Sequence, residues 1–143
     1  MRSEELQMLT LEIPNRIFEQ MLGQARAESP IEACGILAGR GNTVERMYRM
    51  TNVEAREDHY MMEPAEQFAA VKDMRAAGFD MLAIYHSHPA TAARPSAEDI
   101  RLAFTPNIAY VIISLREADA PVARCFVVEN GCASDIPLNI LEG

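Results

Sequence analysis

The segment AIYHSHPATAARPSAEDIRLAF, residues 83–104, contains the residue types that hold catalytic metal ions. In an extended chain the side chains of residues i and i+2 point to the same face, so His86 and His88 project together. Two imidazoles on one face can bind a single zinc ion through ring nitrogens at about 2.0–2.1 Å. A catalytic zinc site also needs a third protein ligand and an open position for water. Asp99 is the candidate for the third ligand.

The residues from Ser96 to Asp99 also have an ordinary structural interpretation. A serine followed three residues later by an acid is typical of a helix N-cap, which satisfies free backbone N–H groups. Because a helix N-terminus favours a carboxylate, capping and metal binding can coexist. HxH alone is a weak signal, since histidines at strand ends are usually surface or hydrogen-bonded residues. The same pair followed after ten residues by Asp99, with Ser96 three positions before it, is much more specific.

Glu32 is the candidate base for such a site. It lies in SPIEACGILAG, just before an apolar segment that we interpret as a strand entering the core. Zinc lowers the pKa of bound water from 15.7 to about 7, so a nearby carboxylate suffices to take its proton. An isolated glutamate at this place is more often exposed to solvent. The catalytic interpretation of Glu32 therefore depends on the metal triad.

The elements that position these residues follow from hydrophobic periodicity and turn signals. Strands are predicted over 6–13, near 59–62, and over 79–86 and 108–115. Helices are predicted from 14 to 29, from 64 to 78 and over 96–104. Hairpins are predicted at GRGN, within 32–50, and at the NG that joins 121–130 to 132–141. This order predicts a single α/β domain over residues 1–143, with a mixed sheet flanked by about three helices.

Composition excludes several classes of function. Thirteen basic and 21 acidic residues give a net charge of −8, which disfavours nucleic acid as a partner. No apolar stretch approaches the roughly 20 residues needed to cross a bilayer, and MRSEELQMLT lacks the apolar region of a secretory signal. We therefore expect a cytoplasmic protein with no membrane partner. Cys34, Cys125 and Cys132 match no CxxC or zinc-knuckle spacing, which favours buried, reduced thiols.

These motifs resemble the JAMM, or MPN-plus, metallopeptidases. The family pattern is a glutamate, then HxH, then Ser-x-x-Asp, and EACGILAG, HSHP and PSAED fill every position. The resemblance extends over about residues 8–138 and implies a cytidine-deaminase-like α/β sandwich. It also implies zinc held by His86, His88 and Asp99, with Glu32 as general acid and base. Ser96 would donate a hydrogen bond to the developing oxyanion.

The resemblance to compact bacterial members also implies a class of substrate. Such enzymes act at the C-terminal tail of ubiquitin-like sulfur-carrier proteins, and some release cysteine from a carrier–cysteine adduct. We therefore expect hydrolysis of the amide bond after the terminal glycine of such a carrier. The carrier, the released amine and the oligomeric state stay open. Iron or cobalt could replace zinc, because the same ligands bind them.

Three other interpretations are weighed against this one. Metal-free relatives serve as binding scaffolds, but they lack ligands that are present here. RadC-type relatives, associated with DNA repair, read HNHP rather than HSHP. TIM-barrel amidohydrolases also begin with HxH, but their fold needs roughly 250 residues.

Some residues outside the motif also carry expectations. We expect His59 to be a surface residue. Cys34 is expected to be a packed thiol, with a role in the cleft as the alternative. Most of the nine methionines are expected in the core. Met61 and Met62 are the exceptions, because the family places their segment near the active site.

Overall fold

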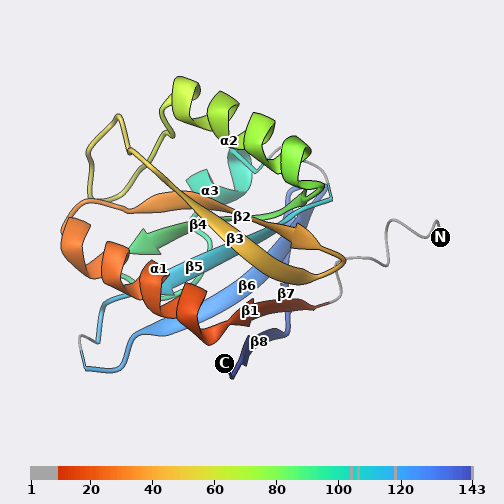
Figure 1. Ribbon diagram of the computed structural model, residues 1–143. Helices are drawn as coiled ribbons and strands as arrows, with labels where there is room; N and C mark the ends of the chain where they lie inside the picture. The colour runs from red at the N-terminus through yellow and green to blue at the C-terminus, as the bar shows by residue number, and fades with distance from the viewer. Residues whose placement is uncertain (1–9, 104, 106, 118, 143) are drawn as a thin grey trace.

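The computed structural model describes residues 10–103, 105, 107–117 and 119–142 (Figure 1). The chain begins with a strand and a helix, then a hairpin, a second helix, and a strand that leads through a loop into a short third helix. Four more strands complete it. The bounds are β1 Leu11–Pro14, α1 Asn15–Glu28, β2 Cys34–Arg40, β3 Thr43–Met50, α2 Pro64–Ala77, β4 Asp80–His88, α3 Ala97–Arg101, β5 Ala109–Ser114, β6 Val122–Glu129, β7 Cys132–Ile136 and β8 Leu138–Leu141.

The strands form one mixed sheet in the order β7-β6-β5-β4-β2-β3-β1-β8. Strand β4 lies at its centre, antiparallel to β2 and parallel to β5. The expected fold class, a mixed α/β sheet flanked by three helices, is confirmed within the described residues. The extension of one domain over residues 1–143 stays a prediction.

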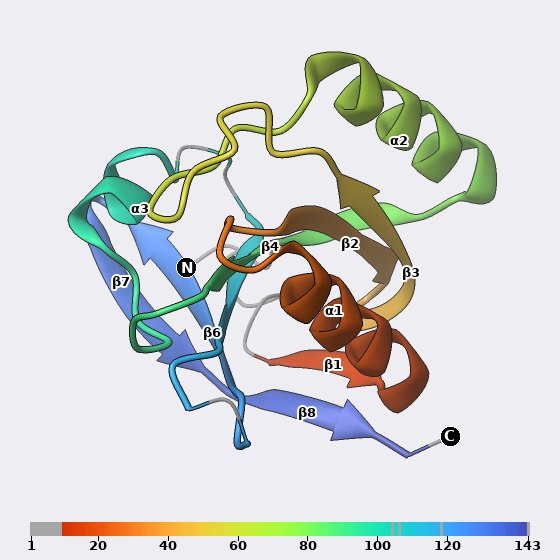
Figure 2. The same cartoon turned by 90° about the vertical axis from the view of Figure 1, so that its left-hand side faces the viewer.

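Alternate residues of the central strands pack against different helices. One apolar cluster joins α1, through Ile17 and Met21, to Leu37 of β2 and Tyr85 of β4. A second joins α2, through Ala70 and Met74, to Cys34 and Ile36 of β2. Because side chains alternate along a strand, the residues of β2 next to those facing α1 face α2 instead. Figure 2 shows α1 and α2 on opposite sides of β2 and β4.

Two predicted strands differ from those observed. The segment 132–141 was expected to be one extended piece, but Pro137 divides it into β7 and β8, which lie at opposite edges of the sheet. Proline has no N–H for a ladder, and its carbonyl instead accepts a 3.0 Å hydrogen bond from the Leu11 N–H. The strand expected near 59–62 is wrong, since that segment has only an isolated bridge between Met62 and Asn52.

The remaining predicted elements are close to those observed. Helix α2 has Pro64 in its first turn and ends at Gly78, whose φ of 75° suits glycine. Helix α3 is shorter than the predicted 96–104. Part of the strand predicted over 6–13 lies outside the described residues. Within the described residues, no helix is long and apolar enough to cross a membrane.

Candidate metal centre and catalytic site

Strand β4 carries both histidines into the centre of the sheet. His86 pairs with Cys34 of β2 on one side and with Ile112 of β5 on the other, while His88 pairs with Ser114. Both histidines are buried, as expected for the end of a strand with neighbours on two sides. The i, i+2 spacing places their rings on the same face, and the ring centroids lie 5.0 Å apart.

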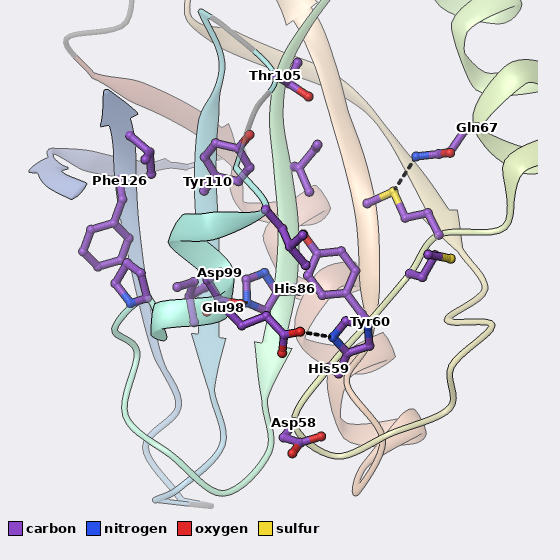
Figure 3. A pocket seen from close by; sticks show the side chains of 17 residues that line it. Asp58, His59, Tyr60, Gln67, His86, Glu98, Asp99, Thr105, Tyr110 and Phe126 are labelled. Atoms are coloured by element: carbon purple, nitrogen blue, oxygen red, sulfur yellow. Dashed lines mark hydrogen bonds and ion pairs between the residues drawn. The ribbon is translucent and has the colours of Figure 1, made fainter. Parts of the chain in front are cut away.

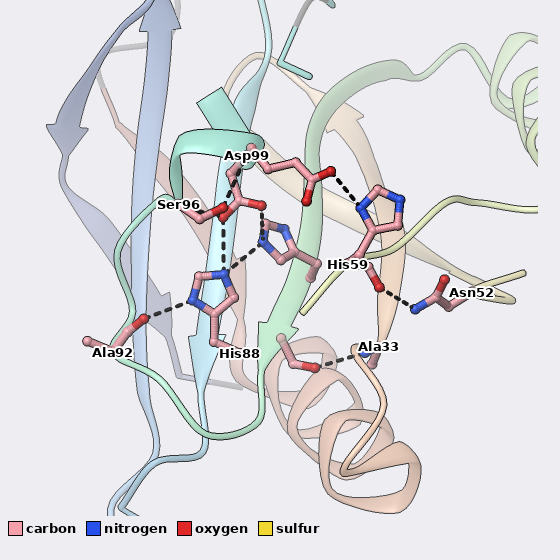
Figure 4. Close-up of polar contacts among 10 residues, drawn as sticks. Ala33, Asn52, His59, His88, Ala92, Ser96 and Asp99 are labelled. Carbon is pink, nitrogen blue, oxygen red and sulfur yellow. Dashed lines mark hydrogen bonds and ion pairs between the residues drawn. The ribbon is translucent and has the colours of Figure 1, made fainter. Parts of the chain in front are cut away.

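Helix α3 brings Asp99 to the same place. The Asp99 N–H donates to Ser96 Oγ at 3.0 Å, and the Ser96 N–H donates to Asp99 Oδ2 at 2.9 Å. This reciprocal capping box fixes the start of the helix and the direction of the aspartate side chain. The expected N-cap is therefore present, and Asp99 also reaches the two imidazoles (Figure 4).

The three side chains converge with the spacing of ligands around one ion. His86 Nε2 lies 3.2 Å from His88 Nε2. The Asp99 oxygens lie 3.3 Å from His86 Nε2 and 3.1 Å from His88 Nε2. Two atoms bonded to one tetrahedral zinc at about 2.0–2.1 Å stand ~3.3–3.4 Å apart, so the observed spacing fits this metal. Within the described residues this is the one group of three such side chains that could hold a metal ion.

Hydrogen bonding prepares His88 for this role. Its Nδ1 lies 2.9 Å from the Ala92 carbonyl, which can only accept, so Nδ1 carries a proton, and Nε2 is the nitrogen that would bind a metal ion after giving up any proton of its own. His86 Nδ1 is buried with no hydrogen-bond partner among the described residues. Burial lowers the pKa of His86, which favours the neutral ring that binds metals.

Asp99 is held ionised beside these rings. Burial alone would raise the pKa of Asp99, but hydrogen bonds from His86 and His88 outweigh it and hold that pKa well below its usual range. Burial lowers the pKa of His88, but the hydrogen bonds to Asp99 and to the Ala92 carbonyl raise that pKa by more. The pKa of His88 is therefore raised overall. A carboxylate and two imidazoles of this kind form a ligand set that zinc accepts.

Glu32 lies beside the same site, in the segment just before β2. The pairing of Cys34 with His86 continues through the Ser87 N–H, which donates to the Ala33 carbonyl at 3.0 Å, and so brings Glu32 opposite His88. Glu32 is only 3% exposed, and its Oε1 has no hydrogen-bond partner among the described residues. Burial, opposed by the charge of His88, raises the pKa of Glu32 to about 8. The solvent-exposed alternative for Glu32 is therefore wrong.

Beside His86 and Asp99 lies a pocket of about 230 Å³ (Figure 3). Tyr60 forms one wall by stacking on His86, with ring centroids 4.7 Å apart. His59 and Glu98 meet across the pocket lining, with 3.0 Å between Nδ1 and Oε2. The expectation that His59 is a simple surface residue is wrong, because loop 51–63 folds its side chain to 19% exposure against α3. Met61 and Met62 also line the pocket, as their placement near the site predicted, together with Ile84, Tyr110, Ile112 and Phe126.

Cys34 and Ser96 lie near the three candidate metal ligands but are not among them. Cys34 is fully buried in the apolar cluster beneath α2, and its thiol lies 3.8 Å from the Met50 carbonyl. These contacts match the prediction of a packed thiol. Ser96 is exposed, and its hydroxyl oxygen accepts the cap hydrogen bond, which leaves the O–H proton available for donation.

The sequence motifs did not indicate Tyr60, Asn52 or Ser87, although all three contact the site or its neighbours. The hydroxyl of Ser87 accepts from the Ala33 N–H at 2.8 Å. The only local signal for Ser87 was its place between the two histidines, at i+1, where a strand turns its side chain to the other face.

Comparison with known proteins gives an independent result. Residues 14–128 match the family of prokaryotic homologs of the JAB domain. The CysO-cysteine peptidase of Mycobacterium tuberculosis is 36% identical over 124 residues, which cover 85% of each chain. A probable TtuB-protein conjugate cleaving protease of Thermus thermophilus is 36% identical over 94 residues, or 65% of this chain and 63% of that protein.

A solved structure agrees over almost the whole fold. The solution structure of protein DSY2949 from Desulfitobacterium hafniense has a TM-score of 0.85 and 44% identity, and the match covers 93% of this chain and 94% of that one. The family match includes Glu32, both histidines and Asp99. The resemblance drawn from the motifs is confirmed, and the chain belongs to the prokaryotic JAB-domain family.

Proposed function

We propose that this protein is a zinc-dependent peptidase that cleaves the amide bond after the C-terminal glycine of a ubiquitin-like or sulfur-carrier protein. The observation that carries the proposal is the convergence of His86 Nε2, His88 Nε2 and the Asp99 carboxylate within 3.1–3.3 Å of one another. Zinc bound by these residues would supply Lewis-acid stabilisation of negative charge and a nucleophile at neutral pH.

Glu32 acts as the general base and then as the general acid. It takes a proton from the attacking water as the oxygen bonds to the amide carbon, and it gives that proton to the nitrogen when the C–N bond breaks. Burial supports this role, because the raised pKa of about 8 increases the affinity of Glu32 for a proton near neutral pH. A carboxylate in water would hold the proton too weakly to deliver it.

Ser96 stabilises the negative charge that develops during the reaction, and the capping box holds its hydroxyl in place. The Ser96 hydroxyl donates to the oxygen that becomes negative when water adds to the amide. Its own oxygen already accepts from the Asp99 N–H, which fixes the hydroxyl at the start of α3. One preorganised donor of this kind is worth about 10²–10³ in turnover.

The substrate class rests on the relatives. One is named as a CysO-cysteine peptidase and another as a probable TtuB-protein conjugate cleaving protease. We therefore propose that the carrier is a small protein with a ubiquitin-like tail and that cysteine is one amine released. The free state of Cys34, Cys125 and Cys132 supports a reducing compartment such as the cytoplasm.

A mass measurement tests the reaction. The protein is incubated with a sulfur-carrier protein extended after its terminal glycine by cysteine, or by a short peptide. We expect loss of the extension with zinc present and no loss after chelation. Glu32→Gln should reduce the rate by roughly 10²–10⁴, the usual contribution of acid–base catalysis. Glu45→Gln is the matched control, since Glu45 is exposed in the hairpin and pairs with Arg40. If zinc-loaded protein shortens neither carrier, the substrate assignment is wrong.

A further inference from the structure

Asn52 uses its whole side-chain amide to connect two segments beside the site. It lies just after β3, at the start of loop 51–63, and is only 7% exposed. Its Nδ2 donates to the carbonyls of Glu32 and His59, each at 3.0 Å. Its Oδ1 accepts from the N–H groups of Glu54 at 3.0 Å and Met61 at 3.1 Å. A primary amide has two donors and two acceptor lone pairs, so every hydrogen-bonding position of Asn52 is used.

The main chain at Glu32 depends on such contacts because Glu32 precedes β2. Its N–H donates to the Arg56 carbonyl at 2.9 Å, and its carbonyl accepts from Asn52. The next N–H, that of Ala33, donates to Ser87 Oγ at 2.8 Å. The two bonds of Glu32 connect it to loop 51–63. The bond of Ala33 connects the next residue to β4, at Ser87 between the two histidines. The position of the Glu32 main chain opposite His88 therefore depends on where the loop is held.

The same loop carries the residues that cover His86. Tyr60 stacks on His86, and its neighbours on either side, His59 and Met61, are both hydrogen-bonded to Asn52 through their main chains. Figure 4 shows the bond between Asn52 and His59. A shift of Asn52 would move the Glu32 main chain and the Tyr60 ring together. Asn52 itself does not line the pocket, so it acts on the site through the residues that it holds, Glu32 and the segment from His59 to Met61.

We propose that Asn52 is a positioning residue for the hydrolysis, which holds the Glu32 carboxyl and the Tyr60 ring in one arrangement around the two histidines. This inference rests on the proposed function for the role of Glu32 in turnover. The arrangement itself is a property of the chain and does not depend on any substrate. Asparagine is required because aspartate lacks both donors and glutamine is one carbon longer.

The first test measures the arrangement without activity. In Asn52→Asp the side chain keeps its acceptors and loses the two bonds to the Glu32 and His59 carbonyls. We expect backbone hydrogen exchange at Glu32 to accelerate about tenfold or more, while exchange at Ala33, which bonds to Ser87, stays slow. Asn42→Asp is the matched control, because within the described part of the chain the one bond of Asn42 Nδ2 goes to Thr10 Oγ1, at 2.6 Å, beside the β2–β3 turn. Equal exchange at Glu32 in wild type and Asn52→Asp would overturn the proposal.

The second test separates positioning from simple stability. Using the carrier–cysteine substrate, we expect Asn52→Asp to lower kcat roughly 10–100-fold, the usual effect of residues that orient a metal site from behind. KM and zinc content should stay at the wild-type values, and Asn42→Asp should leave kcat unchanged. In a Glu32→Gln background, Asn52→Asp should add little further loss, because both changes then remove the same step.

The outcomes keep the two proposals apart. If wild-type protein cleaves no carrier, the proposed function fails, while hydrogen exchange still decides whether Asn52 holds Glu32. If the losses of kcat from Glu32→Gln and Asn52→Asp multiply in the double variant, Asn52 does not act through Glu32 and the positioning role is wrong. If Asn52→Asp does not fold, Asn52→Ser provides the second variant, since its shorter hydroxyl keeps a polar group but cannot span both carbonyls.

Discussion

Glu32 is a carboxyl group that the fold keeps out of water and leaves without a hydrogen-bond partner on Oε1 among the described residues. An arrangement of this kind costs stability, because a buried polar atom loses its hydration. It is also what gives a carboxylic acid a proton affinity suited to catalysis at neutral pH. The burial of Glu32 therefore serves catalysis at a cost in stability, and that cost can be measured.

The stability of the metal-free protein should depend on the proton of Glu32. Burial raises its pKa from 4.5 to about 8 on folding, so the folded protein keeps a proton that the unfolded chain releases. Its stabilising contribution is complete below pH 4.5, declines between about 4.5 and 8, and is absent above that range. With chelated protein, we expect the unfolding free energy of wild type, minus that of Glu32→Gln, to fall across this window in urea titrations. Parallel pH curves for the two proteins would contradict the burial argument.

The three thiols should differ sharply in reactivity. Burial raises the pKa of Cys34 and of Cys125 to about 12, so both stay protonated and covered, whereas Cys132 is exposed. We expect a thiol-specific chromogenic reagent to label one cysteine quickly in the native protein and three in denaturant. Cys132→Ser should abolish the fast label and leave turnover unchanged. Rapid labelling of Cys34 would favour its alternative role in the cleft.

Helix α3 combines two functions in its first turn. Ser96 caps the helix, and the same hydrogen bonds direct Asp99 toward the histidines. The sequence predicted both roles, because the cap and the ligand use overlapping residues. What the sequence could not decide was whether the Ser96 hydroxyl has a further role in the reaction.

Two substitutions of Ser96 separate capping from catalysis. Ser96→Ala should cost about 0.5–2 kcal/mol of stability, whereas Ser96→Gly should cost only a few tenths, since glycine is a good N-cap. Both remove the hydroxyl, and both keep the main-chain N–H that bonds to Asp99. We therefore expect the same loss of kcat, about 10²–10³, in both variants despite their different melting temperatures. A glycine variant with nearly full kcat would limit Ser96 to capping.

Loop 51–63 shows where prediction from local pattern ends. Its segment DHYMM has β-forming residues, which favoured a strand, yet the chain there is held by the side chain of Asn52 rather than by a ladder. His59 was expected at the surface because no nearby residue in the sequence indicates its contact with Glu98. The first error involves side-chain bonds within the loop, and the second a contact between distant segments; hydrophobic periodicity detects neither.

At the scale of the whole molecule, the sheet order explains why a pattern spread over 68 residues, from Glu32 to Asp99, becomes one site. Strands β2 and β4 are neighbours in the sheet. The connection between the parallel strands β4 and β5 contains α3, which brings Asp99 beside both histidines. The sequence predicted the family and nearly all the elements, because HxH, the helix cap and the buried strands are local signals. It did not predict that Pro137 sends β8 to the far edge beside β1, because that pairing joins segments more than 120 residues apart along the chain.

The zinc content of purified variants tests the central claim most directly. After loading with zinc and gel filtration, elemental analysis should find one zinc per wild-type chain and one per Glu32→Gln chain. His86→Ala, His88→Ala and Asp99→Ala should each lose most of it, and His59→Ala should keep it. A triple variant that lacks both histidines and Asp99 but still holds one zinc per chain would contradict the assignment of these three residues as the metal ligands.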